Sequence, residues 1–103
     1  MSDNKNNQNI IAALEKVEHP SIAATLVYLG MLRDIEIDQD GKVSLVLVLP
    51  FPSIPDNIRN YMVNSLAAAA NSAGGELQKA GLALMTKEEV QDFLAKEKAN
   101  WRG

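Results

Sequence analysis

The first apolar pattern in the chain has the spacing of a helix. Apolar residues three and four positions apart lie on one side of an α-helix. In this segment they are Ile10, Ile11, Leu14 and Val17. Pro20 ends the pattern, because proline disfavours helical geometry in the residue before it and has no N–H to donate. Residues 1–8 are polar and rich in asparagine, so we expect a disordered lead-in there.

Two strands are predicted between residues 31 and 49. In the first, the odd-numbered positions carry Arg33, Ile35 and Ile37, and the even-numbered positions carry Asp34, Glu36 and Asp38. Such alternation is typical of a strand with one polar face. Asp40-Gly41 favours a tight hairpin turn, because this dipeptide tolerates positive φ angles. Residues 43–49 are apolar except for Ser44. This predicts a central strand covered on both faces, or one covered once and packed in a dimer.

The second half of the chain has the pattern of a helix, a strand and a helix. Apolar residues step by four along one helical face: Ile54, Ile58, Met62, Leu66 and Ala70. Gly74-Gly75 supplies the left-handed geometry common after a helix, and residues 76–85 predict a third strand. Thr86 and Glu89 have the spacing of a capping box and begin a last helix. The predicted fold class is therefore α+β, a single small domain of order α-β-β-α-β-α with helices packed on a three-stranded mixed sheet.

Length and composition indicate one domain, which we place at residues 9–103 of the 103. The net charge of −3 argues against nucleic acid as a partner, because phosphate binding needs a cationic surface. No apolar run has the roughly 18 residues of a membrane span, and the N-terminal residues lack the apolar core of a signal peptide. We therefore expect no membrane association and a cytoplasmic location. The absence of cysteine removes disulfides, thiolate nucleophiles and sulfur-ligated metals.

Two groups of titratable residues are candidates for chemistry, and each has a simpler explanation. His19 is the only histidine, and a lone imidazole without cysteine cannot build an ordinary zinc site. It is better explained as a helix-terminal residue than as an acid or base. The densest carboxylate cluster is Asp34, Glu36, Asp38 and Asp40. Its spacing matches no calcium-binding loop, so a solvated strand face explains it better. We predict no metal site and no cofactor.

The most distinctive segment is the proline-rich stretch that leads into the second helix. A loop at a helix N-terminus offers free N–H groups and the positive end of the helix dipole. Ser53 and Asp56 have the spacing of a helix cap, and no residue is evidently placed to activate the Ser53 hydroxyl, so we expect a cap there rather than a nucleophile. Phe51 either faces the core or is an exposed contact. The candidate interaction loop comprises Phe51, Pro52, Ser53, Ile54, Pro55 and Asp56.

Trp101 is the candidate contact anchor outside this loop. Aromatic residues are enriched in interface hot spots, although Trp101 could equally fold back on the last helix. The sequence contains no G-x-x-x-x-G-K-[ST], G-x-G-x-x-G or G-x-S-x-G. Nucleotide hydrolysis, dinucleotide binding and hydrolase chemistry therefore have no local support, and we expect no catalytic residues and no enzyme.

Several short motifs together resemble the iron–sulfur-cluster assembly domain family. That family includes the N-terminal domain of Mrp/ApbC-type carriers and small SufT- and PaaD-related proteins. Leu29-Gly30-Met31-Leu32 is similar to the family's approach to the first strand, and Gly41-Lys42-Val43 to its hairpin. Pro20, Pro52 and Pro55 match family prolines, and the resemblance covers roughly residues 9–85. The family's loop cysteine falls on Ile54, and His19 and Ser21 replace its acidic residue and glutamate. The resemblance thus identifies a cysteine-less variant.

The resemblance implies a non-catalytic accessory or interaction module in iron–sulfur cluster assembly, without its own cluster-ligating cysteine. Its protein partner would be a carrier, a scaffold or a P-loop ATPase, contacted beside the Pro50–Pro55 loop. The alternative is a structural or dimerising interaction domain with no remaining role in cluster assembly. In that case an edge strand, or the doubly apolar strand at 43–49, would pair with a second copy.

Overall fold

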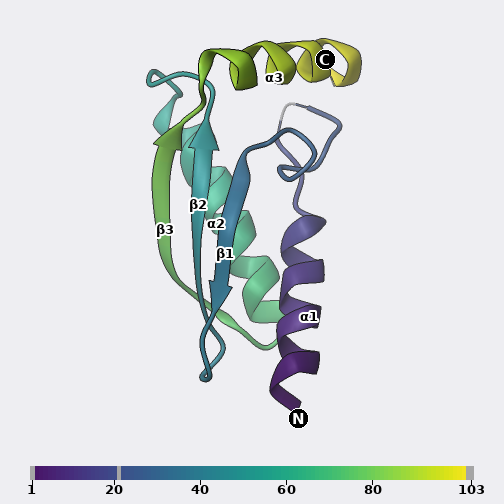
Figure 1. Cartoon of the computed structure of the whole chain (residues 1–103), viewed down its shortest axis with the longest axis vertical. Coiled ribbons are helices and arrows are strands. Elements are labelled where there is room, and N and C mark those ends of the chain that lie inside the picture. The colour runs from purple at the N-terminus through teal and green to yellow at the C-terminus, as the bar shows by residue number, and fades with distance from the viewer. Residues whose placement is uncertain (1, 21, 102–103) are drawn as a thin grey trace.

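The structure is a computed structural model that describes the backbone of residues 2–20 and 22–101, and the side chains from residue 8 onward within those ranges. Its elements are α1 (Ser2–Glu15), β1 (Leu32–Ile37), β2 (Lys42–Leu49), α2 (Asp56–Ser72), β3 (Glu76–Leu84) and α3 (Lys87–Asn100). The predicted order α-β-β-α-β-α is confirmed (Figure 1). Helix α1 includes most of the segment at 1–8, and the disorder expected for that segment stays a prediction. Ser21 lies outside the described residues.

The three strands form one mixed sheet with β2 in the centre. Strand β1 pairs antiparallel with β2, and β3 pairs parallel with β2 on the other side. Figure 1 shows α2 behind the sheet with α1 beside it, while α3 lies across the end where β2 and β3 finish. The predicted α+β class and the central position of β2 are both confirmed.

The core lies between the sheet and the helices α1 and α2. Alternate residues of β2 point into it, and Val43, Leu45 and Leu47 are buried there. Helix α2 contributes a stripe with a spacing of four residues, and α1 adds the first part of its own apolar stripe. These buried helical residues are Met62, Leu66, Ala70, Ile10 and Leu14. The helical stripes predicted from sequence therefore form the face that each helix buries.

The strand face predicted for Arg33, the same as that of Ile35 and Ile37, is wrong. The strand pairs Arg33 with Val46 but Glu36 with Ser44, so it contains one residue more than β2 over this stretch. Asp34 has a φ of 56°, a left-handed value typical of a β-bulge. Because the bulge reverses the alternation, Leu32 is buried on the inner side while Arg33 is exposed with Glu36 on the outer side. A period of two cannot reveal an inserted residue in advance.

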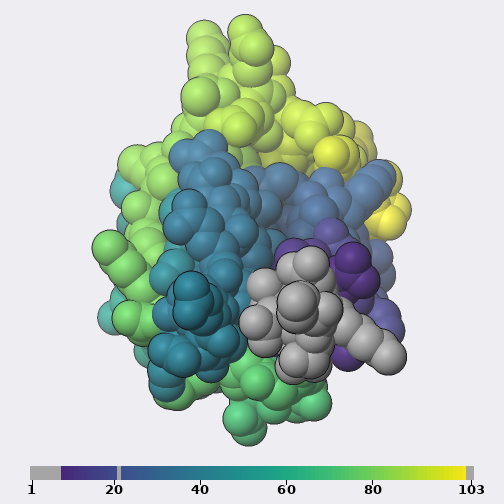
Figure 2. Space-filling model, turned by 60° about the horizontal axis from the view of Figure 1, so that its bottom comes forward, coloured from purple at the N-terminus to yellow at the C-terminus, as the bar shows by residue number. Residues whose placement is uncertain are grey.

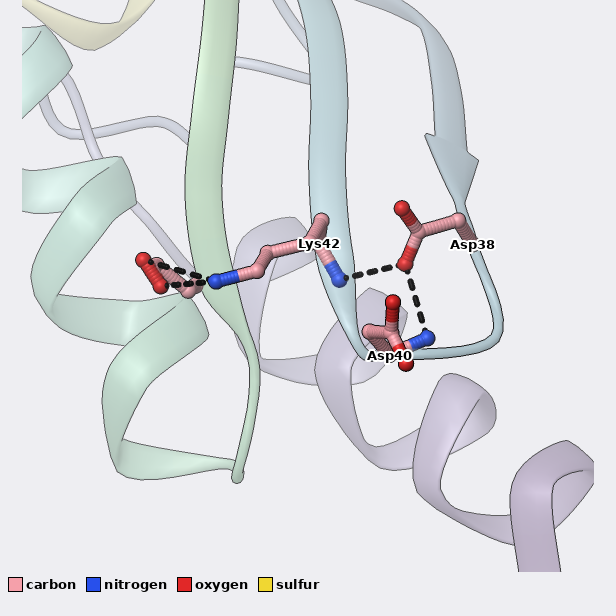
Figure 3. A network of polar contacts seen from close by, with 4 residues as sticks. Asp38, Asp40 and Lys42 are labelled. Carbon is pink, nitrogen blue, oxygen red and sulfur yellow. Dashed lines mark hydrogen bonds and ion pairs between the residues drawn. The ribbon is translucent and has the colours of Figure 1, made fainter.

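At one end of the sheet, the β1–β2 turn meets the turn from α2 to β3. We call this the hairpin end (residues 38–42 and 74–76). One Asp38 carboxylate oxygen accepts hydrogen bonds from the backbone N–H groups of Asp40 and Lys42, each at 2.9 Å (Figure 3). Gly41 has a φ of 77°, so the tight turn predicted at Asp40-Gly41 is confirmed. Figure 2 brings this end forward, with the hairpin in teal beside the green of β3.

An ion pair joins the two turns of the hairpin end. The Lys42 ammonium lies 2.5 Å from one oxygen of the Glu76 carboxylate and 3.1 Å from the other. The hydrogen bond to Glu76, together with its negative charge, raises the pKa of Lys42 above 10.5. Gly75 follows the left-handed Gly74, which has a φ of 93°, so the predicted glycine exit from α2 is also confirmed. The hairpin end is thus fixed by local backbone geometry and polar contacts.

Candidate functional site

At the opposite end of the molecule, the proline-rich loop reaches the start of α2. We call this the loop end (residues 50–58, with His19, Met31 and the second half of α3). Helix α2 begins later than the Ser53 cap requires, because its N-cap is Pro55, which has a ψ of 142° and no side-chain acceptor. The predicted Ser53 cap is therefore wrong, and Ser53 is exposed. Asp56 instead pairs with Arg59 at 2.9 Å within the first turn.

The loop end encloses a small apolar cavity of about 140 Å³. Three segments distant in sequence line it: the connection after α1, the proline-rich loop with the start of α2, and the second half of α3. The lining residues are His19, Met31, Pro50, Phe51, Ile54, Pro55, Ile58, Phe93, Glu97 and Trp101. The cavity thus brings three residues of the candidate interaction loop together with the candidate anchor. Pro52, Ser53 and Asp56 are exposed outside this lining.

The floor and the rim of this cavity differ in exposure. Met31 is fully buried and Phe93 is 3% exposed, so both belong to the core. Met31 lines the cavity from the connection before β1, and Phe93 lines it from α3. Phe51 is 41% exposed and Trp101 56% exposed, so both present aromatic surface to solvent. Phe51 is therefore exposed rather than core-facing, and the role of Trp101 as a contact anchor stays a prediction. Exposed aromatic side chains beside an apolar hollow make this end a candidate contact surface.

Helix α3 holds Trp101 at the rim. The capping box predicted at its start is confirmed, with the Glu89 N–H 3.2 Å from the Thr86 hydroxyl and the Thr86 N–H 2.8 Å from the Glu89 carboxylate. This hydrogen bond from the Thr86 backbone lowers the pKa of Glu89 below 4.5. At the other end, the Asn100 carbonyl accepts a hydrogen bond from the Ala23 N–H at 2.8 Å, and Trp101 forms a single antiparallel bridge with Ile22.

Midway along α3, Lys96 fastens the helix to the connection before β1. Its ammonium donates to the Tyr28 carbonyl at 2.9 Å and lies 4.8 Å from the centre of the Tyr28 ring. The same ammonium pairs with Asp92 at 2.8 Å. Sequence reasoning missed the contacts of Tyr28, Lys96 and Phe93 at this end of the molecule. Helical spacing can predict that Phe93 is buried, but no local pattern predicts which loop lies against it.

The remaining candidates do not come together as a polar site. His19 lines the cavity, and its backbone N–H donates to the Ala24 carbonyl at 3.1 Å. Asp34 and Glu36 are exposed on β1, while Asp38 caps the hairpin. Across the described part of the chain, no group of three or more histidine, cysteine, aspartate or glutamate side chains is arranged to hold a metal ion. Nor does any helix within those residues have the length and apolar character to cross a membrane.

Known proteins resemble this chain both in fold and in sequence. A three-stranded mixed sheet with two helices on one face and a proline-rich loop before α2 is the architecture of a small α+β domain. The profile of the family described as "Iron-sulfur cluster assembly protein" matches residues 7–78, and the chain belongs to this family. The match includes the whole proline-rich loop and the β1–β2 hairpin but ends before α3.

Two individual proteins are similar to the chain. The "Fe-S protein maturation auxiliary factor YitW" of Bacillus subtilis (strain 168) is 33% identical over 48 residues, which are 47% of this chain and 47% of that protein. The aligned stretch thus spans about half the length of that relative. A crystal structure of a "Domain of Unknown Function DUF59" from Bacillus anthracis superposes with a TM-score of 0.56 at 18% identity. It covers 92% of this chain and 94% of its own, and it supports the fold alone.

Proposed function

We propose that this protein is a non-catalytic accessory module of iron–sulfur protein maturation that acts in the cytoplasm by docking a protein partner at its loop end. The observation that carries the proposal is the family match across residues 7–78. The resemblance of the sequence to this family also implies that Ile54 takes the position of the family's loop cysteine. The name of the similar Bacillus protein, a maturation auxiliary factor, points to the same process. An isoleucine has no thiolate, so the loop offers no sulfur ligand for a cluster.

The surroundings of Ile54 support a docking role for the loop. Its side chain is half-buried and lines the apolar cavity with Phe51 and Trp101. An isoleucine in this position adds to the apolar surface of the cavity. A reactive thiolate there would instead need polar or positively charged neighbours. Buried aromatic and aliphatic anchors contribute most of the free energy at protein interfaces. We therefore propose Phe51, Ile54 and Trp101 as the anchors, and a carrier, a scaffold or a P-loop ATPase of cluster assembly as the partner.

Anaerobic reconstitution with ferrous iron and sulfide tests the absence of a cluster ligand. After desalting, the protein is expected to retain no stoichiometric iron or sulfide and to lack the visible absorption of a cluster. Ile54→Cys is the matched variant, because it restores the thiolate at the family position with the rest of the loop unchanged. A stable, stoichiometric cluster on the unmodified chain would falsify the proposal, whatever the variant does.

One observation favours a second candidate, a dimerising structural domain. Strand β3 is an edge strand of nine residues, and two of its leucines are unusually exposed, Leu82 at 53% and Leu84 at 55%. An exposed apolar edge strand is a template for pairing with another chain. Light scattering separates the candidates: this alternative requires a dimer that becomes a monomer in Leu82→Lys. A monomer across the micromolar range would exclude it.

A further inference from the structure

We propose that α3 is a hinged roof over the loop-end cavity, which swings away at Thr86 and exposes the apolar floor beneath Phe93. The roof side of the cavity consists of Phe93, Glu97 and Trp101, and the opposite side of Met31, Ile54 and Ile58. In the closed state, the α3 side chains cover this opposite side, so the helix acts as an autoinhibitory contact. The autoinhibitory role of α3 rests on the docking role proposed above, whereas the opening of α3 does not.

The contacts of α3 are those of an element that detaches before the core unfolds. Phe93 is its one buried residue, whereas α2 buries Met62, Leu66 and Ala70. Its other attachments are the half-buried Val90 against the core, Lys96 on Tyr28, and the short backbone pairing of residues 22–23 with 100–101. Elements with few buried apolar contacts and solvent-exposed hydrogen bonds open locally, at a fraction of the global free energy.

The two ends of α3 are built differently, which allows a hinge. At Thr86 the chain is extended, with φ −69° and ψ 167°, and the capping box satisfies the first turn from within the helix. The helix can therefore leave the cavity without losing this cap. The far end is fastened to another segment, because Asn100 accepts from Ala23 and Trp101 pairs with Ile22. Opening the cavity therefore requires the release of this far attachment, of the Lys96 contact with Tyr28 and of Phe93.

Hydrogen exchange of the full-length chain tests the opening without any partner. The amides of residues 91–100 are expected to exchange as one unit, at least about tenfold faster than those of the α2 interior, under conditions where global unfolding is negligible. Lys96→Met removes the bond to Tyr28 and should speed α3 exchange several-fold while leaving α2 unchanged. Lys98→Met, on the same helix but without such a bond, is the matched control. If α3 and α2 exchange at the same rate in all three proteins, the roof does not open and the inference is wrong.

An engineered cross-link gives a second, independent test. Ile22 and Trp101 lie opposite each other in an antiparallel bridge, and the neighbouring hydrogen bond joins Ala23 to Asn100. In a pair of this type the two Cα atoms have a spacing suited to a disulfide. The chain has no other cysteine, so Ile22→Cys/Trp101→Cys forms one defined disulfide, and its reduced form is the control. Oxidation should suppress the fast exchange of α3 and leave the α2 rates as they are in the reduced protein. Equal α3 exchange in both forms would contradict a hinge at Thr86.

Discussion

The two ends of the sheet are fixed by different kinds of interaction. At the hairpin end, glycine geometry, one aspartate cap and the Lys42–Glu76 pair hold two turns against each other. At the loop end, two prolines, a core phenylalanine and two exposed aromatic rings surround a cavity that three distant segments share. The first end satisfies its own polar groups, whereas the second leaves apolar surface exposed. On the proposed function, the hairpin end serves the fold and the loop end serves binding.

The largest effect on stability is expected at the hairpin end, from Gly75→Ala. A Cβ atom there would lie 2.7 Å from Ile10 Cδ1 and 3.1 Å from the Gly41 carbonyl oxygen. Overpacking of this kind lowers the free energy of unfolding by about 1–3 kcal/mol, which urea titration measures. Gly81→Ala is the matched control, because its nearest neighbour would be Val46 Cγ2 at 3.7 Å. If both variants cost the same, the close approach at Gly75 is not what fixes this end.

A smaller loss is expected from Thr86→Ala at the start of α3. This variant removes the hydroxyl that accepts from the Glu89 N–H, a cap worth about 1 kcal/mol of helix stability. The loss should appear mainly as faster hydrogen exchange in α3, because that helix is attached more weakly than α2. Thr86→Ser keeps the hydroxyl and should behave like the unmodified chain. Equal behaviour of the alanine and serine variants would remove the capping box from the account.

Changes of pH should affect the two regions at opposite extremes. The pKa of Glu89 is lowered in the folded state, so the capping box stabilises α3 above pH 4.5 and loses this contribution as the pH falls through the lowered pKa. The pKa of Lys42 is raised, so its pair with Glu76 stabilises the hairpin end below pH 10.5 and loses this contribution as the pH rises through the raised pKa. Thermal unfolding of Glu89→Gln and Lys42→Met across the pH range checks this. The difference in thermal stability between Glu89→Gln and the unmodified chain should vanish only at low pH. The corresponding difference for Lys42→Met should vanish only at high pH.

The smallest effect on stability is expected from Trp101→Ala. Because more than half of this side chain is exposed, its loss should change the free energy of unfolding by no more than about 1 kcal/mol. The same variant should weaken docking, since the ring forms part of the cavity rim. Chemical unfolding and partner binding measured on one preparation separate the two roles. A large loss of stability would instead make Trp101 a structural residue of α3.

The sequence predicted the framework of the fold better than its ends. Apolar periodicity located the helical stripes of α1 and α2, and the pairs Asp40-Gly41 and Thr86/Glu89 predicted a turn and a cap that the structure contains, because each depends on neighbours within a few residues. The bulge at Asp34 and the cap at Pro55 were missed, because in each case one residue changes a pattern that otherwise fits. The candidate loop and Trp101 were both identified, but no local pattern could predict their meeting with Phe93 and Met31. That meeting depends on where α3 lies across the sheet.

The central claim is that the loop end binds a protein partner while the hairpin end does not. Calorimetric titration with a purified Mrp-type P-loop ATPase from the same genome tests it, with Phe51→Ser and Lys42→Met as paired surface variants. The account predicts that the unmodified chain and Lys42→Met bind alike, and that Phe51→Ser binds at least about tenfold more weakly, a loss of about 1.4 kcal/mol. Equal binding by both variants, or a loss confined to Lys42→Met, would contradict the account.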